Sequence, residues 1–212
     1  TDEEELKKLQ RQKQQEKNQI DAEHDIRFRF DTNWQQYDTF NMSIGQGYND
    51  YTVMQLANYV ATIANGGYLM RPHIMKSVVS HEGKTLKTVK PEVIDEVDVS
   101  PATIAETRRA MLAVAQPGGT AHFLFAHFPA EFQVVAKTGT AETGRQGDNP
   151  KKDYHGVFIA FAPFADPEIA FAGVIEYGYS GGGSVGYVAR DIFEHYFGIK
   201  DHLADEKALE DE

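Results

Sequence analysis

The clearest hydrophobic pattern in the chain is a helical one between residues 53 and 64. Apolar side chains recur there at intervals of three and four residues, as expected of a helix with one buried face. Gly66 and Gly67 follow at the place where a helix commonly ends. The pattern therefore predicts a buried helix, and its apolar positions are Val53, Leu56, Ala57, Val60, Ile63 and Ala64.

Two further helices are predicted from a start signal and from apolar spacing. Ser100 followed by Pro101 is typical of a helix start, because serine caps a helix and proline suits its first position. We expect this helix to run to about Gln116, where a proline and two glycines follow. A last helix is predicted over residues 185–197. The apolar side with which we expect it to cover the sheet consists of Val188, Ile192, Phe193, Tyr196 and Phe197.

Runs of β-branched and aromatic residues between these helices predict strands. Segment 72–97 alternates such residues around the turn signal of residues 81–84, which predicts a hairpin and further short strands. The apolar runs of residues 154–163 and 168–178 are joined by a short turn, the layout of neighbouring antiparallel strands. Their near-continuous hydrophobicity predicts cover on both faces. A third strand is predicted over residues 132–136, with a polar continuation at residues 137–140.

The order of these elements predicts the fold class. Helix and strands are followed by a second helix, three more strands and a final helix, which is typical of an α+β fold with an antiparallel sheet flanked by helices. Residues 1–20 contain charged helix formers and only three apolar side chains, so we expect an exposed helix there. Residues 200–212 are predicted to be an acidic, frayed end.

Composition narrows the possible partners. The chain has 21 Lys and Arg residues against 32 Asp and Glu residues, and its formal charge of -11 disfavours nucleic acid as a partner. The absence of cysteine excludes disulfides, thiolate metal sites and cysteine nucleophiles. No apolar run approaches the roughly 18 residues of a membrane span. We expect a soluble chain or the soluble part of a larger protein.

The segment VVAKTGTAE, residues 134–142, begins as an apolar strand and then turns polar. In a regular strand Lys137 and Gly139 lie on one face, and Thr138 and Thr140 lie on the other. The ammonium and hydroxyl groups could hold a carboxylate, and a glycine leaves room for a peptide backbone to lie against the strand. A backbone N–H after the glycine could stabilise an oxyanion, an effect of roughly 3 kcal/mol in hydrolases. Alternatively, these side chains only face water and the glycine marks a bulge.

The surroundings of this segment carry a family resemblance. The sequence KTGT followed by Ala141 and Glu142 is one of three signature motifs of penicillin-binding proteins and serine β-lactamases. The flanking segments 43–76, 117–121, 155–163 and 181–193 resemble class B penicillin-binding transpeptidases, so that the likeness spans about residues 41–197. It implies part of the penicillin-binding/serine β-lactamase-like transpeptidase fold.

The resemblance also implies an activity. In this family a serine attacks the penultimate D-alanine carbonyl of a peptidoglycan stem peptide, releases the last D-alanine and passes the acyl group to an amine. By resemblance Lys137 and Thr138 bind the carboxylate of the substrate or of a β-lactam antibiotic, and Gly139 keeps the strand surface open. Thr140 supplies an oxyanion N–H and a hydroxyl. No cofactor and no metal is implied, and the expected place of action is the outer face of a bacterial cytoplasmic membrane, reached through an anchor outside this sequence.

One departure from the family pattern changes the expected activity of this chain. The nucleophile of the family lies in an SxxK motif and its partner in an SxN motif, and neither occurs at Ser43, Ser77, Ser80, Ser100, Ser180 or Ser184. We therefore expect a fragment, in which residues 1–40 form a charged helix and connector. Residues 41–199 then form the C-terminal half of a transpeptidase domain, and residues 200–212 an acidic tail. The nucleophile is expected in a missing N-terminal part, so the chain alone is expected to be inactive.

Two alternatives to an enzyme fragment stay open: an inert peptide-binding or structural module, and a β-lactamase or β-lactam sensor. Other candidate sites are weaker. The histidines show no metal-ligand spacing, although His155 could border a cleft. The glycine run of residues 180–184 is expected to be a loop at the rim of the site, and residues 144–153 a polar lip of the cleft. The phenylalanines are expected to be core, with residues 122–128 as one cluster that could form a groove.

Overall fold

The computed structural model describes residues 2–143 and 154–199. The chain divides into two compact units, Thr1–Asp50 and Tyr51–Glu212, and each is described here by itself. The sequence predicted a domain boundary between residues 40 and 41 from the family resemblance, and this boundary stays a prediction. None of the helices in the described ranges is long and apolar enough to cross a bilayer.

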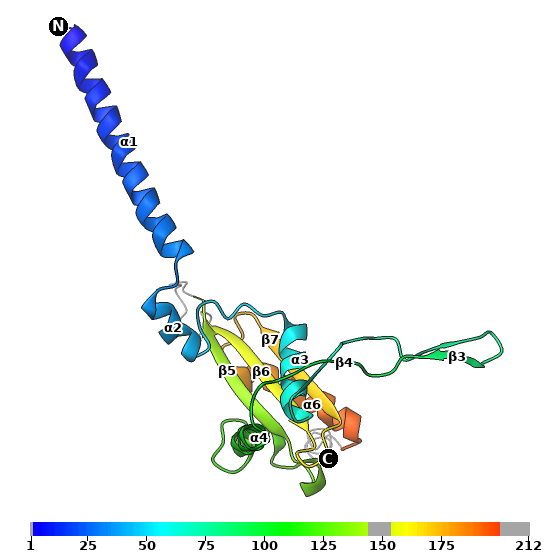
Figure 1. The fold of residues 1–212 in the computed structure, drawn as a ribbon. Coiled ribbons are helices and arrows are strands. Elements are labelled where there is room, and N and C mark those ends of the chain that lie inside the picture. The colour runs from blue at the N-terminus through cyan, green and yellow to red at the C-terminus, as the bar shows by residue number, and fades with distance from the viewer. Residues whose placement is uncertain (1, 144–153, 200–212) are drawn as a thin grey trace, which may run out of the picture. The chain divides into compact units, whose positions relative to one another are not determined.

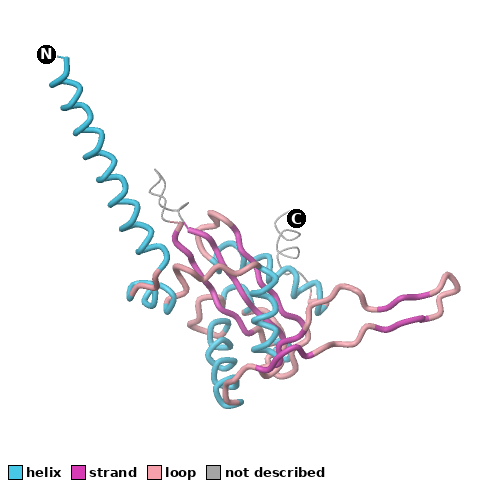
Figure 2. The backbone as a smooth tube through the Cα atoms, turned by 45° about the horizontal axis from the view of Figure 1, so that its top comes forward, coloured by secondary structure: helices cyan, strands magenta, loops and turns pink. Residues whose placement is uncertain are grey.

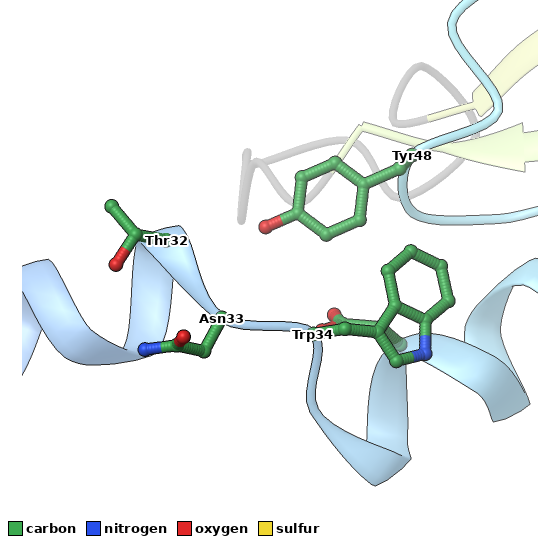
Figure 3. A pocket seen from close by; sticks show the side chains of 5 residues that line it. Thr32, Asn33, Trp34 and Tyr48 are labelled. Atoms are coloured by element: carbon green, nitrogen blue, oxygen red, sulfur yellow. The ribbon is translucent and has the colours of Figure 1, made fainter.

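The first unit consists of two helices. Helix α1 (Asp2–Thr32) is longer than the 20 residues predicted (Figure 1). Its side chains are exposed along residues 4–30. Helix α2 (Gln36–Ser43) was not predicted; it starts with a capping box in which the Gln35 N–H donates to the Asp38 carboxylate at 2.7 Å. The rings of Trp34 and Tyr48, 6.0 Å apart, line a cavity of about 250 Å³ beside this helix start (Figure 3).

The second unit is built on a three-stranded antiparallel sheet. Its strands are β5 (Val135–Glu142), β6 (Tyr154–Ala162) and β7 (Ile169–Ile175), in the order β5-β6-β7 (Figure 1). The predicted pairing of the two long apolar runs is confirmed by β6 and β7. The prediction that the third strand begins at Phe132 was wrong, because Ala130–Phe132 forms a 3-10 turn whose Phe132 N–H donates to the Pro129 carbonyl. The ring of Phe132 instead stacks on Phe197 at 4.5 Å.

An arm extends from this unit, and Figure 2 shows it projecting away from the three-stranded sheet. The predicted hairpin is confirmed there as β2 (Ser77–Val79) paired with β3 (Thr85–Thr88), and β1 (Tyr68–Met70) pairs with β4 (Val93–Glu96). Arg71 and Glu92 tie the chain together at the base of the arm, with Nε and Oε2 2.7 Å apart. The hydrogen bond from Arg71 lowers the pKa of the Glu92 carboxyl and raises that of the guanidinium.

The two long helices before the sheet begin and end where their signals predicted. Helix α3 (Val53–Ala64) is capped by Thr52, whose hydroxyl accepts from the Gln55 N–H at 3.2 Å. Helix α4 (Pro101–Ala115) is capped by Ser100, whose hydroxyl accepts from the Thr103 N–H at 3.1 Å. Both predictions are confirmed, because capping residues act through their own neighbours in sequence.

Helices cover both faces of the sheet, as the near-continuous apolar runs predicted. On one face Phe158 and Ala160 pack against buried residues of α5 (His122–Phe125) and α6 (Gly186–Phe197). On the other face Val135 and Phe161 pack against α3 and against Met111 of α4. The alternation of β6 therefore divides its side chains between two separate clusters.

The buried side of α6 differs from the predicted one. Ala189 and Phe193 are fully buried, whereas Val188, Ile192 and Tyr196 are 45%, 41% and 50% exposed. These three residues lie four apart and form a stripe of their own beside the buried one. The prediction that all five apolar positions cover the sheet was wrong for this reason.

We expect adjacent alanine substitutions in α6 to differ sharply. Phe193→Ala removes a fully buried ring and should lower the free energy of unfolding by about 3–5 kcal/mol. Ile192→Ala is the matched control on the exposed side and should cost less than about 1.5 kcal/mol, since much of that side chain already contacts water. Urea unfolding followed by circular dichroism measures both, and equal losses would contradict this orientation of the helix.

Candidate functional site

A cavity of about 370 Å³ lies beside strand β5. Three separate segments line it: the stretch that leads into α5, the strand itself, and the glycine turn before α6. The turn is a short π-helix, η3 (Gly181–Val185). The lining residues are Thr120, Phe123, Thr138, Thr140, Ser180, Gly181, Gly182 and Gly183.

The register of β5 decides which side chains reach this cavity. Thr138 pairs with Phe158 and Thr140 with Gly156, without a break in register along the strand. Both threonines consequently lie on the same face, as the alternation predicted. Within the described residues β5 pairs with β6 alone, so its other edge is open. An edge strand directs every second N–H away from its neighbour in the sheet.

Among the described residues that line the cavity, Thr120, Thr138, Thr140 and Ser180 carry hydroxyl groups, and no side chain carries a charge. The hydroxyl oxygens of Thr120 and Thr138 are 3.1 Å apart and share a hydrogen bond. The Ser180 hydroxyl accepts from the Gly183 N–H at 3.0 Å, which directs its own proton elsewhere. Hydroxyl groups from three segments thus line one cavity, an arrangement suited to an anionic oxygen such as a carboxylate.

The structure places the four sequence-predicted site residues in different ways. Thr138 and Thr140 line the cavity together. The side chain of Lys137 does not: it is exposed, its strand position shares the opposite face with Gly139, and its Nζ donates to the Thr138 carbonyl. Gly139 contributes its backbone, which lies against the glycine turn.

The glycine turn can approach the strand closely because Gly181 carries no side chain. A Cβ built on Gly181 would lie 2.6 Å from the Gly139 carbonyl oxygen and closer still to that of Val157. A Cβ on Gly156 would lie 2.5 Å from the Ser184 hydroxyl. The chain enters this turn through Tyr177 and Tyr179, both in the left-handed region with φ of 56° and 70°. Such backbone persists only where surrounding structure holds it.

Sequence reasoning missed three residues of the cavity as site residues, Thr120, Phe123 and Ser180. Two glycine-containing segments, residues 117–121 and 180–184, could have indicated that Thr120 and Ser180 belong to the site. The second segment was expected at the rim of the site. Its residues 180–183 do line the cavity, as a π-helical turn. Phe123 was grouped with the core phenylalanines, but it is 55% exposed.

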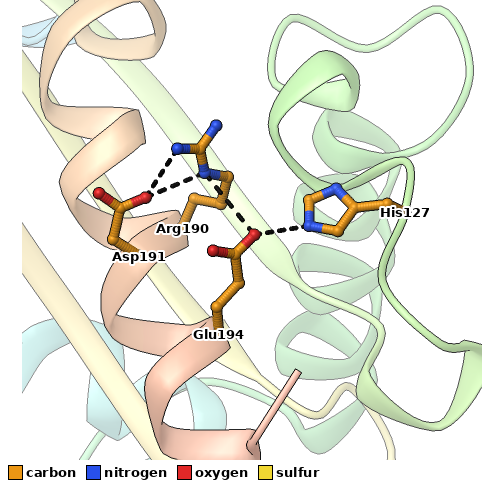
Figure 4. A network of polar contacts seen from close by, with 4 residues as sticks. All are labelled: His127, Arg190, Asp191 and Glu194. Carbon is orange, nitrogen blue, oxygen red and sulfur yellow. Dashed lines mark hydrogen bonds and ion pairs between the residues drawn. The ribbon is translucent and has the colours of Figure 1, made fainter. Parts of the chain in front are cut away.

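The histidines singled out in the sequence lie elsewhere. His155 pairs with Ala141 and therefore faces away from the threonines; its Nδ1 accepts from the Tyr177 N–H at 3.2 Å. His127 contacts Glu194 through its Nε2 at 2.6 Å (Figure 4). Across residues 2–143 and 154–199, no three His, Cys, Asp or Glu side chains gather as a metal site would require. The predicted polar lip, residues 144–153, and the acidic tail lie outside the described residues.

Comparison with known proteins gives one consistent family. The family model described as penicillin binding protein transpeptidase domain matches residues 11–194. Penicillin-binding protein 2A of Bacillus subtilis is 34% identical over 173 residues, which are 76% of this chain and 24% of that protein. Peptidoglycan D,D-transpeptidase MrdA of Escherichia coli is 32% identical over 177 residues, 79% of this chain and 27% of that protein. The chain thus spans about a quarter of the length of these relatives.

Solved structures agree with the sequence relatives. Pseudomonas aeruginosa PBP2 in complex with WCK 5153 superposes with a TM-score of 0.65 at 29% identity, over 83% of this chain and 37% of that one. The ceftriaxone acyl-enzyme complex of penicillin-binding protein A from M. tuberculosis gives a TM-score of 0.60 at 30% identity, over 73% of this chain and 34% of that one. The expected α+β transpeptidase fold, present in part, is confirmed.

The contact between the glycine turn and the strand makes a testable prediction. Gly181→Ala should lower the free energy of unfolding by about 1–3 kcal/mol, because the new methyl group meets backbone atoms of two strands. Gly182→Ala is the matched control: its nearest neighbour, the Thr120 carbonyl oxygen, is 3.4 Å from the new carbon, an ordinary contact. Thermal unfolding compares the two variants, and equal melting temperatures would contradict the close approach.

Proposed function

The chain belongs to the penicillin-binding protein transpeptidase family, and on that premise we propose that it forms the carboxylate-binding half of a serine D,D-transpeptidase. Its relatives include proteins named peptidoglycan D,D-transpeptidases. The observation that carries the proposal is the cavity that Thr138 and Thr140 of the KTGT segment line together with the hydroxyl-bearing residues Thr120 and Ser180 of two other segments. The ligand is the D-alanine terminus of a stem peptide or the carboxylate of a β-lactam.

The carboxylate of the ligand is assigned to the hydroxyl groups of three threonines. Thr138 and Thr140 project from one face of the strand at alternate positions, and the Thr120 hydroxyl lies 3.1 Å from that of Thr138. A carboxylate offers about four lone-pair sites, so several donors can bind it at once. Hydrogen bonds to a charged acceptor contribute about 1.5–3 kcal/mol each, more than those between neutral groups.

Lys137 is assigned the positive charge for the ligand, because no described residue that lines the cavity is charged. Its ammonium donates to the Thr138 carbonyl, within one residue of the cavity, and its side chain is exposed. The flexible four-carbon stem allows the ammonium to exchange that contact for a bound carboxylate or for a group of the catalytic serine motif. A cation at this position also raises the local concentration of an anionic ligand around a chain whose net charge is -11.

The Thr140 backbone N–H is assigned to the oxyanion that forms during acyl transfer. It belongs to the strand whose other edge is open, and Gly139 before it carries no side chain that would hinder an approaching peptide. The serine oxygen attacks the penultimate carbonyl, the carbonyl oxygen takes the negative charge, and the terminal D-alanine leaves with a proton. An amine of a second stem peptide then takes the acyl group and frees the serine.

The serine itself is assigned to a part of the parent protein outside this sequence. No SxxK or SxN occurs among the 212 residues, and the matched relatives are about four times as long as the segment they share with this chain. The parent is placed at the outer face of a bacterial cytoplasmic membrane, where stem peptides are cross-linked. The N-terminal remainder of the protein is then the partner that completes the site.

Carboxylate binding is tested by titrating N-acetyl-D-alanyl-D-alanine and its C-terminal amide into the chain and following the backbone amide signals by NMR. We expect the acid to shift the Thr138 and Thr140 signals and the neutral amide to bind far more weakly. Lys137→Gln and Thr140→Ala should each weaken binding of the acid about 10-fold or more, as expected for a hydrogen bond to a charged group.

Matched controls lie on the arm, where Lys87→Gln and Thr88→Ala change the same residue types at exposed positions of β3. Their affinities should equal that of the unchanged chain. Equal binding of the acid and the amide, or equal effects of the site and control variants, would contradict the assignment.

Covalent labelling tests where the nucleophile lies. We expect no band from this chain after incubation with a fluorescent penicillin and denaturing electrophoresis, because none of its serines has the lysine of an SxxK motif. A labelled band would overturn the assignment of the serine to another part of the protein. Ser180→Ala would then identify whether the serine at the cavity had reacted, since Ser180 lines it.

A further inference from the structure

Phe123 is the one aromatic side chain among the described residues that line the cavity. Its neighbours on α5, Leu124 and Phe125, are 0% and 5% exposed and belong to the core, whereas Phe123 is 55% exposed. The Phe123 ring lies near Gly182, since a Cβ built there would be 3.9 Å from its Cε1 atom. An apolar surface consequently stands next to the hydroxyl groups of the cavity.

The Phe123 ring is supported from helix α6. It meets the ring of Tyr187 edge-on, with the centroids 6.0 Å apart and the planes at 62°. The guanidinium of Arg190 lies 5.1 Å from the centroid of Tyr187 and favours that ring position through a cation–π contact. Such support holds an exposed ring in one place, which lowers the entropy lost when a ligand packs on it.

Arg190 is itself fixed by a polar network at the junction of the two elements. Its guanidinium binds Asp191 at 2.8 Å and approaches Glu194 at 3.7 Å, and its side chain is only 11% exposed (Figure 4). Glu194 contacts His127, which follows α5 by two residues, at 2.6 Å. Helix α6 therefore holds the segment around α5 at two points, through Tyr187 to Phe123 and through Glu194 to His127.

We infer that Phe123 determines specificity in this cavity by packing against an apolar, preferably aromatic, group carried by the ligand beside its carboxylate. The inference rests on the proposed function, because the threonine hydroxyls hold the carboxylate end while the phenylalanine ring takes the side group. Tyr187 and Arg190 act as positioning residues that keep the ring at the cavity wall. A ligand with only a methyl group in this place lacks that contact.

The test uses two dipeptides with the same terminal carboxylate, N-acetyl-D-alanyl-D-phenylalanine and N-acetyl-D-alanyl-D-alanine, which differ by one phenyl group on the residue that carries the carboxylate. Their dissociation constants are measured on the 212-residue chain from the Thr138 and Thr140 amide signals. We expect the D-phenylalanine dipeptide to bind about 2- to 10-fold more tightly, the range of one aromatic pair. Phe123→Ala should abolish this preference, so that the two dipeptides bind with similar affinity. Tyr187→Ala should reduce the preference in part.

Tyr59→Ala is the matched control, because Tyr59 on α3 is an aromatic residue that is likewise 55% exposed and does not line the cavity. It should leave both affinities unchanged, and the NMR spectrum of each variant shows that it is folded. A preference that survives Phe123→Ala while Thr140→Ala weakens both compounds would overturn the role of Phe123 and keep the proposed function. Failure of both compounds to shift the Thr138 and Thr140 signals would overturn the proposed function itself.

Discussion

The geometry of the site depends on a close backbone contact between the glycine turn and strands β5 and β6. Gly181 lies against the carbonyls of Gly139 and Val157, so η3 approaches β5 and β6 more closely than any larger residue would permit. The turn thereby brings Ser180 and Gly182 opposite Thr138 and Thr140, and it starts the helix that carries Tyr187 and Glu194. Because a packed interior transmits displacement, a shift of this contact would move the strand side and the helix side of the cavity relative to each other.

The two faces of the sheet pack against different helices. On one face Phe158 of β6 packs against α5 and α6, and on the other Phe161 packs against α3. Both faces of the strand interior are occupied. Among the described strands the outer edge of β5 is unpaired, so a ligand can approach β5 at its polar end and along that edge. The polar residues that interrupt the apolar run at Lys137 stand where the strand leaves the core.

Local signals explain which parts of the fold were predictable. Ser100 caps α4 through a hydrogen bond from the N–H of Thr103, three positions on, so the start of this helix could be predicted from adjacent residues. The alternation of β5 and the turn between β6 and β7 are equally local. The start of β5 was placed too early because the stacking of Phe132 on Phe197, 65 residues away in the chain, favours a turn there instead. The exposed stripe of α6 was missed because apolar spacing alone does not identify which of two adjacent stripes meets the sheet.

By itself the sequence determined the family, the α+β class, the faces of Lys137, Thr138, Gly139 and Thr140, and the absence of SxxK and SxN from these 212 residues. These properties depend on residue identity and short spacing, which the linear chain already contains. Only the tertiary structure decided that Thr120, Phe123 and Ser180 join the two threonines at one cavity. Such juxtapositions arise from packing between segments up to about 60 residues apart, where shape and burial, rather than local preference, select the neighbours.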